Sequence, residues 1–244
     1  MAYWALKILL TPLLRIAFSV RAVGRANVPR SGPVILASNH RSFIDSVFMP
    51  LCVRRRVTFV AKAEYFESWK TAWLFRALGM IPLDREGGSA SERALVAARR
   101  VLADGGVLGI YPEGTRSRDG RLYQGHTGVA RLALDTGAVV VPVAQSGTAD
   151  AQPIGATIPK LGKKVTVEFG HPIALSGRGA AERPAAGASV AAGELRRMTD
   201  RVMSAIAAMS GQEQAGMYAR HDRDRLSAPG SEAEPLLVAA ETPG

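Results

Sequence analysis

Apolar runs alternate with amphipathic segments along the chain from residue 33 to residue 169. Short apolar runs predict strands at 33–38, 57–61, 107–111, 138–144 and 165–169, with a brief extended piece at 80–83. Helical spacing predicts helices that begin near residue 43, cover 65–78, run from 89 to about 104, and cover 126–136. Apolar strands separated by helices are typical of an α/β fold. We therefore expect a mixed, largely parallel sheet flanked by helices on both faces.

The segment before these elements, residues 3–20, is strongly apolar but carries a polar residue at every fourth position. These polar residues are Lys7, Thr11, Arg15 and Ser19. The apolar runs between them are too short for a membrane-spanning helix, which needs about 20 apolar residues. Two interpretations stay open: an amphipathic helix that lies in a membrane interface, or a helix docked on its own domain. Trp4 and the nearby arginines favour the membrane, and Pro12 predicts a kink or a split in the helix.

Composition divides the chain into four parts. Residues 1–30 form the amphipathic, membrane-associating segment, and residues 31–175 form the α/β domain. Residues 176–210 are an alanine-rich linker that includes an isolated amphipathic helix at 194–209. Residues 211–244 are polar, contain proline and carry charges of both signs, so we expect them to be disordered.

Charge and cysteine content narrow the classes of function. The formal net charge is +10, and no Asp or Glu occurs before Asp45. A basic front favours an anionic partner. We expect a lipid surface and no nucleic acid, because neither zinc-finger spacing nor an aromatic RNA-binding strand is found. The single cysteine, Cys52, excludes an internal disulfide framework and a cysteine-based zinc site, and no metal site is predicted.

A histidine and an aspartate lie five positions apart where the first predicted strand gives way to a helix. If His40 lies in the loop and Asp45 in the first helical turn, the chain can fold back and pair them. An aspartate bonded to one ring nitrogen leaves the other free to accept a proton from a hydroxyl. The alternative is that Ser42 and Asp45 form only a helix-capping box, with His40 an ordinary loop residue.

Two arginines follow extended segments at the edge of the sheet where His40 is expected. Arg85 comes two residues after the piece at 80–83, and Arg116 follows the strand at 107–111. Together they would form a clamp for a phosphate group, and Gly114 would let the backbone approach the ligand closely. Pro142 interrupts the strand at 138–144, which predicts a bulge or a sheet edge near the site.

Four segments then resemble, in order, the sequence blocks of the glycerolipid acyltransferases. They are His40-x-x-x-x-Asp45, Gly79–Arg85, Tyr111-Pro112-Glu113-Gly114-Thr115-Arg116 and Val139–Val143. The chain is most similar to the 1-acylglycerol-3-phosphate acyltransferase type, over residues 39–143 for the blocks and to about residue 175 for the domain. Any one block is a weak signal, whereas four in this order and spacing are a strong one.

The resemblance implies a role for each block. His40 is the expected general base, oriented by Asp45. Arg85 binds the acceptor phosphate, and the segment Glu113, Gly114, Thr115 and Arg116 completes the substrate pocket. Lys62 is similar, more loosely, to a position near the phosphate, and Pro142 shapes the acyl site.

The chain departs from the family pattern at two positions. Tyr111 stands where phenylalanine is usual. His126 stands near a position where a lysine often occurs, so it could be a weaker, pH-dependent contact or the mark of a different acceptor.

The expected reaction moves a fatty acyl group from acyl-CoA or acyl carrier protein to the hydroxyl of 1-acylglycerol 3-phosphate, giving phosphatidate. The thioester is already activated, so no cofactor or metal is expected. Other acceptors remain open: glycerol 3-phosphate, a lysophospholipid or a glycosylated phosphoinositide. Phosphate-ester hydrolysis and non-catalytic binding of anionic lipid are the alternatives from other classes. The expected location is the cytoplasmic face of the cell membrane, as a peripheral or monotopic protein.

Overall fold

The computed structural model describes residues 2–62, 64–67, 72, 73, 75, 76, 78–83, 90–175 and 191–219. Its strands are β1 (Val20–Val23), β2 (Val34–Ser38), β3 (Val57–Lys62), β4 (Ile81–Leu83), β5 (Val107–Ile110), β6 (Val139–Ser146) and β7 (Val165–Phe169). Its helices are α1 (Ala2–Phe18), η1 (Arg25–Asn27), α2 (Asp45–Cys52), α3 (Glu64–Glu67), α5 (Ala90–Ala103), α6 (Gly128–Thr136), α7 (Thr148–Ala151) and α8 (Ala192–Ser210).

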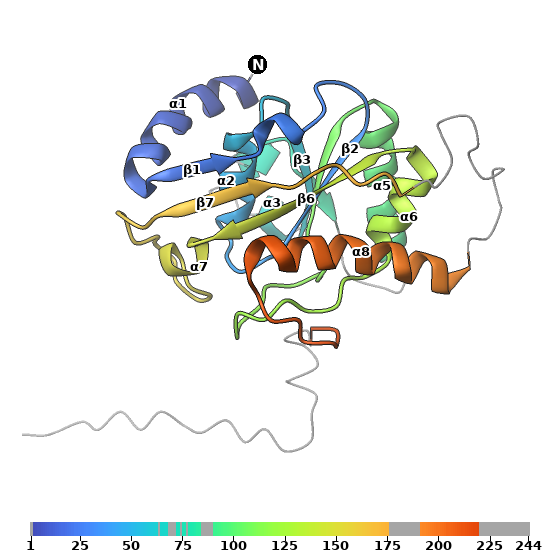
Figure 1. Cartoon of the computed structure of the whole chain (residues 1–244). Coiled ribbons are helices and arrows are strands. Elements are labelled where there is room, and N and C mark those ends of the chain that lie inside the picture. Colours follow the sequence, from blue (N-terminus) through green and yellow to red (C-terminus); the bar gives the residue numbers. More distant parts are fainter. Residues whose placement is uncertain are drawn as a thin grey trace, which may run out of the picture.

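The seven strands form one sheet in the order β1-β7-β6-β2-β5-β3-β4. Strands β4, β3, β5, β2 and β6 run parallel to one another. Strand β7 runs antiparallel to β6, and β1 runs parallel to β7. This confirms the expected mixed, largely parallel sheet. The carboxyl ends of the five parallel strands therefore lie at one edge, together with the amino ends of β1 and β7 (Figure 1).

The strand sequences bury side chains on both faces of the sheet because neighbouring residues point to opposite sides. In β2, Val34 and Leu36 join the core on the side of α1 and α2, whereas Ile35 and Ala37 join the core on the side of α5, α6 and α8. Figure 1 shows α1 and α8 on opposite sides of the strands. Continuous apolar strands of this kind require cover on both faces, as the sequence predicted.

Helix α1 docks on the domain through Tyr3, Leu14 and Phe18. Tyr3 and Phe18 are buried, the amino group of Lys7 donates to the carbonyl of Val53, and burial lowers the pKa of Lys7 to about 8. The helix is continuous through Pro12, so the proline does not split it. The helix is therefore docked on its own domain, and its outer side keeps the exposed apolar residues Ile8, Leu9, Leu13 and Ile16. Among the described helices, none combines the length and the apolar character needed to cross a membrane.

Pro142 lies in a central strand and not at an edge, which corrects one expectation. Strand β6 has β2 on one side and β7 on the other, and Pro142 is paired in register with Ala37 of β2. On the β7 side its carbonyl accepts from the backbone of Gly170, just beyond the end of β7. The missing amide hydrogen thus falls where β7 has already ended, so a proline is tolerated in a central strand.

The end of the described chain packs on the domain, in contrast to the expected isolated helix and tail. Helix α8 buries Val202, Met203 and Ile206 in the core on the α5 and α6 side of the sheet, called the second core here. After it, residues 211–219 form backbone hydrogen bonds to residues 122–124. The backbone of Leu122 donates to Glu213 and accepts from Ala215. These partners are brought into reach only by folding, so the polar composition of the segment does not reveal them.

Candidate active site

The loops that follow β2 and β5 meet at the carboxyl edge of the sheet. His40 comes two residues after the end of β2, and Glu113 comes three residues after the end of β5. The backbone amide of Ser117 donates to the carbonyl of His40 at 2.8 Å. The segment 113–117 therefore wraps around the loop that holds His40.

His40 and Asp45 are in direct contact. Nδ1 of His40 lies 2.9 Å from Oδ2 of Asp45, and their side chains are 17% and 1% exposed. With Asp45 ionised, the shared proton belongs to Nδ1, and Nε2 is left as an acceptor. No hydrogen-bond partner of Nε2 is found within the described residues. The pair therefore has the arrangement of a general base and the acid that orients it.

Asp45 stands at the first turn of α2, where the chain turns back toward His40. Its Oδ2 also accepts from the backbone amides of Arg41 and Ser42, both at 2.8 Å. The Ser42 hydroxyl donates instead to the carbonyl of Gln152, so the reciprocal capping box is not formed. One carboxylate oxygen thus fixes the loop backbone and the imidazole together.

Tyr111 covers the imidazole of His40. The two rings are stacked, with centroids 3.8 Å apart and planes at 10°. The Tyr111 hydroxyl lies 2.9 Å from the hydroxyl of Ser46, and Phe59 stacks near the tyrosine ring. Burial and the charge of Asp45 raise the pKa of Tyr111 well above its ordinary value. Tyr111 is therefore a neutral wall that holds the plane of the histidine ring.

Glu113 is fully buried and bonded to the backbone on both sides. Its Oε1 accepts from the amide of His40 at 3.0 Å, and its Oε2 accepts from the amide of Tyr123 at 2.9 Å. Burial raises its pKa to about 7, against the opposing effect of these two donors. In this structure Glu113 contacts the histidine loop, so its observed contacts are those of a positioning residue.

Part of the expected phosphate pocket lies within the described residues. Gly114 has a φ of +74°, and a Cβ there would lie 3.2 Å from the ring of His126, so both backbone angle and space favour glycine. Thr115 and Arg116 are half-buried beside it. Arg41, next to His40, contributes a further guanidinium whose buried Nε has no partner in the part of the chain described here.

The side chains of two predicted phosphate contacts, Arg85 and Lys62, are not among those that the structure describes. Arg85 lies outside the described residues. Lys62 is the last residue of β3, at the same sheet edge as His40, and only its backbone is described.

A polar network beside His40 was missed by the sequence analysis. The side-chain oxygen of Asn39 accepts from the amide of Gln145, and its nitrogen donates to the Gln145 carbonyl. The same nitrogen donates to Oε1 of Gln212 at 2.7 Å, and Nε2 of Gln212 donates to the carbonyl of Gly120 at 2.7 Å. Residue 212 is far from the site in sequence, so no local pattern reveals this contact.

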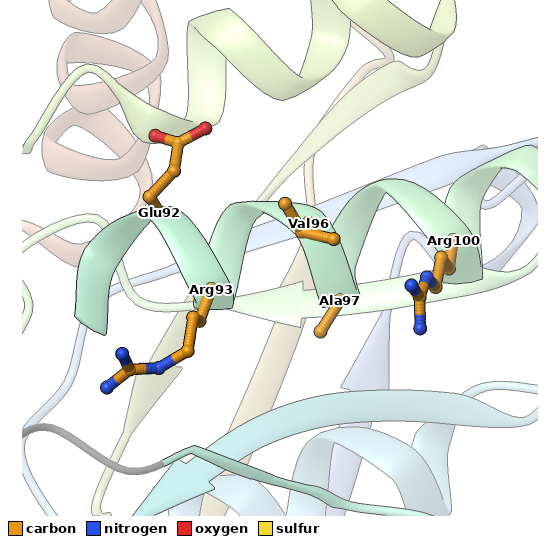
Figure 2. A pocket seen from close by; sticks show the side chains of 5 residues that line it. All are labelled: Glu92, Arg93, Val96, Ala97 and Arg100. Carbon is orange, nitrogen blue, oxygen red and sulfur yellow. The ribbon is translucent and has the colours of Figure 1, made fainter. Parts of the chain in front are cut away.

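Among the described residues, no group of three or more His, Cys, Asp or Glu side chains could hold a metal ion. Figure 2 shows a shallow hollow lined by Glu92, Arg93, Val96, Ala97 and Arg100. All five belong to α5, so the hollow contains none of the groups that surround His40. We assign it no role in the reaction.

The chain is similar in sequence to known proteins. The chain is 32% identical over 139 residues to a chloroplastic 1-acyl-sn-glycerol-3-phosphate acyltransferase of Arabidopsis thaliana, which is 57% of this chain and 39% of that protein. It is 28% identical over 120 residues to a 1-acyl-sn-glycerol-3-phosphate acyltransferase of Borreliella burgdorferi, 49% of this chain and 48% of that protein. The chain thus matches less than half the length of either relative.

A solved structure covers more of the chain. The 1-acyl-sn-glycerophosphate acyltransferase of Thermotoga maritima superposes with a TM-score of 0.63 at 25% identity, over 85% of this chain and 78% of that one. Residues 19–146 match the family model described as Acyltransferase. This match takes in more than half of the chain, from β1 to the end of β6, and it includes His40, Asp45 and the segment 113–117; the chain therefore belongs to the acyltransferase family.

Proposed function

We propose that this protein transfers a fatty acyl group from a thioester to the free hydroxyl of 1-acylglycerol 3-phosphate and so makes phosphatidate. Membership of the family and relatives named for this activity support the proposal. The observation that carries it is the bond between His40 and Asp45, with Nε2 of the histidine left available at the end of the sheet. Donor and acceptor would meet at that nitrogen.

His40 acts as the general base in this proposal. Its Nε2 takes the proton of the acceptor hydroxyl while the hydroxyl oxygen attacks the thioester carbonyl. The carbon–sulfur bond then breaks, and the imidazolium returns the proton to the departing thiolate. Asp45 stabilises the positive charge on the ring between these steps. A positioned base of this kind contributes roughly 10²–10⁴-fold in rate, because a sugar-like hydroxyl is a poor nucleophile at neutral pH.

Arginines recognise the acceptor phosphate in this proposal. A phosphate monoester carries nearly two negative charges, which guanidinium groups bind through paired hydrogen bonds. Arg116 lies next to Ser117, whose amide bonds to the His40 carbonyl, so its backbone is close to the base. Arg85 and Lys62 are the further proposed contacts, with Gly114 and Thr115 in the wall of the pocket and Pro142 near the acyl site.

The donor is acyl-CoA or acyl carrier protein, and the reaction needs no cofactor. The protein would work at the cytoplasmic face of the cell membrane, attached from one side. The exposed apolar face of α1 supports attachment, since Ile8 and Leu13 point away from the domain. Replacing Ile8 and Leu9 by serine should release the protein from membranes while Tyr3 and Phe18 keep α1 docked. Unchanged membrane attachment would argue against this role of α1.

One assay separates the classes of function. The protein is incubated with acyl-CoA and lysophosphatidate, and the release of CoA and the formation of phosphatidate are followed for the wild type and for His40→Ala. We expect both products from the wild type and a loss of roughly 10²-fold or more in the variant. Release of phosphate would indicate hydrolysis, and binding without either product would indicate a lipid-binding protein. Glycerol 3-phosphate, a lysophospholipid and a glycosylated phosphoinositide, added in one mixture, test the alternative acceptors.

A further inference from the structure

The loop between α7 and β7 holds two large aliphatic side chains in solvent. Ile158 is 79% exposed and Leu161 is 71% exposed. The loop is not loosely attached: the amide of Lys160 donates to the carbonyl of Ala151, and the side chain of Gln152 donates to the carbonyl of Ala156. Single exposed aliphatic residues are common on protein surfaces. Two in one fixed loop, with charged residues around them, suggest a contact surface.

This loop lies beside the end of α1. The amide of Gly162 donates to the carbonyl of Ala17 at 2.7 Å, and Val20 of β1 pairs with Val165 of β7. Ile16, in the last turn of α1, is 83% exposed. Figure 1 shows the end of α1, the start of β7 and α7 together at the left of the molecule. The apolar residues of the loop therefore extend the exposed apolar face of α1.

The charges around these side chains are positive. Lys160, Lys163 and Lys164 are exposed, and residues 151–167 contain no Asp or Glu. Arg15 and Arg21 are exposed on the neighbouring segment. A surface that combines exposed aliphatic side chains with lysine and arginine fits a bilayer with anionic headgroups. A water-soluble protein partner would have to match both features as well.

The loop also lies at the same sheet edge as the candidate site. The amino end of β7 and the carboxyl ends of β2 and β6 share this edge. The hydroxyl of Ser42, in the histidine loop, donates to the carbonyl of Gln152 at the start of this loop. A surface bound through Ile158 and Leu161 would therefore be held near His40, on the side where an amphiphilic acceptor must enter.

We infer that residues 153–164 are a second membrane contact, which together with α1 places the histidine edge of the sheet against an anionic bilayer. This inference rests on the proposed function for its lipid substrate. It assigns different tasks to the two elements: α1 attaches the protein, and the loop sets the orientation in which the acceptor passes from bilayer to site.

The test uses the full chain with Ile158→Asp and Leu161→Asp combined. The control is Val96→Asp, which places one carboxylate at an exposed aliphatic residue of α5 outside this surface, and each of the two single variants is compared with it as well. Binding is measured by sedimentation with vesicles of equal parts phosphatidylcholine and phosphatidylglycerol. We expect the double variant to bind at least about ten-fold more weakly than the wild type, because two apolar side chains no longer enter the lipid. The control should bind as the wild type does.

Activity is measured with two acceptors, a long-chain lysophosphatidate in the same vesicles and a short-chain, water-soluble one. The double variant should lose activity on the first and keep it on the second. Wild-type binding by the double variant, an equal loss on both acceptors, or a change of oligomeric state in light scattering would overturn the inference. If the wild type acylates neither acceptor, the proposed function fails, and the vesicle binding still decides whether the loop contacts lipid.

Discussion

The ring of Tyr111 lies parallel to the ring of His40, with 3.8 Å between their centroids. Asp45 holds the histidine at Nδ1, and Tyr111 covers one face of its ring, so the imidazole is held both at one ring nitrogen and on one face. A base that abstracts a proton must be held in this way, since small errors of geometry are costly in rate.

The stacking predicts different effects of two substitutions at one position. Tyr111→Phe removes the hydroxyl, which contacts Ser46 and Gln145, and keeps the ring, so kcat should stay within about three-fold of the wild type. Tyr111→Ala removes the ring beside His40, and kcat should fall roughly ten-fold or more. Steady-state kinetics of both variants check this, and equal kcat values would show that the stack has no role.

The three hydrogen bonds to Oδ2 of Asp45 make D45N an informative variant. The amide oxygen can replace Oδ2, and the amide nitrogen can occupy the place of Oδ1, which has no partner within the described residues. The fold should therefore survive, while the negative charge that would stabilise an imidazolium in the proposed mechanism is lost. We expect kcat to fall about 10²-fold or more with a nearly unchanged KM and melting temperature. A large fall in melting temperature would instead mark Asp45 as structural.

Glu113 should make stability depend on pH. Its pKa is raised from 4.5 to about 7 by burial, so the folded state binds this proton more tightly than the unfolded state does. Its stabilising contribution is complete below the unfolded pKa and is lost as pH rises through about 7. In E113Q the group stays neutral, and that part of the pH dependence should vanish. The urea midpoints of the two proteins at about pH 5 and about pH 8 measure the difference. An equal change of the midpoint between these pH values in the wild type and in E113Q would contradict the prediction.

The proposed phosphate contact of Arg116 predicts a selective effect on the acceptor. Arg116→Ala should raise the acceptor KM by roughly 10- to 100-fold, because hydrogen bonds between charged groups are lost. The donor KM should stay near its wild-type value. Arg85→Ala should behave in the same way. Arg131→Ala is the matched control, because this arginine is exposed on α6. An equal rise of both KM values would refute the assignment.

Gln212 predicts that the segment after α8 influences the rate. Gln212→Ala removes the bond to Asn39, the neighbour of His40, and the bond to Gly120. We expect kcat to fall about five-fold, the equivalent of one hydrogen bond, with little change in KM. Q212E keeps the acceptor for Asn39 and should recover part of the loss. Gln214→Ala, an exposed position in the same segment, is the control.

Temperature separates a positioning role of Gln212 from a merely structural one. The kcat values are compared well below the melting temperatures of the variants, where each remains folded. A loss of rate that appears only near the melting transition would leave Gln212 without a role in positioning His40.

The sequence by itself determined the parts of the fold that depend on local pattern. The strands β2, β3, β5, β6 and β7 lie within about two residues of their predicted limits, because continuous apolar runs can only be buried between two layers of helices. The pairing of His40 with Asp45 was also predicted, since both residues flank one tight turn between a strand and a helix.

Contacts between distant segments were decided only by the tertiary structure. Strand β1 was not predicted, since it is a four-residue edge strand whose burial depends on pairing with β7. The place of Pro142 in a central strand depends on where β7 ends. Gln212 reaches Asn39 only because α8 packs across the second core and returns the chain to the site. Hydrophobic periodicity records which face of an element is buried, whereas the identity of the residue on the other side is set by how the elements pack together.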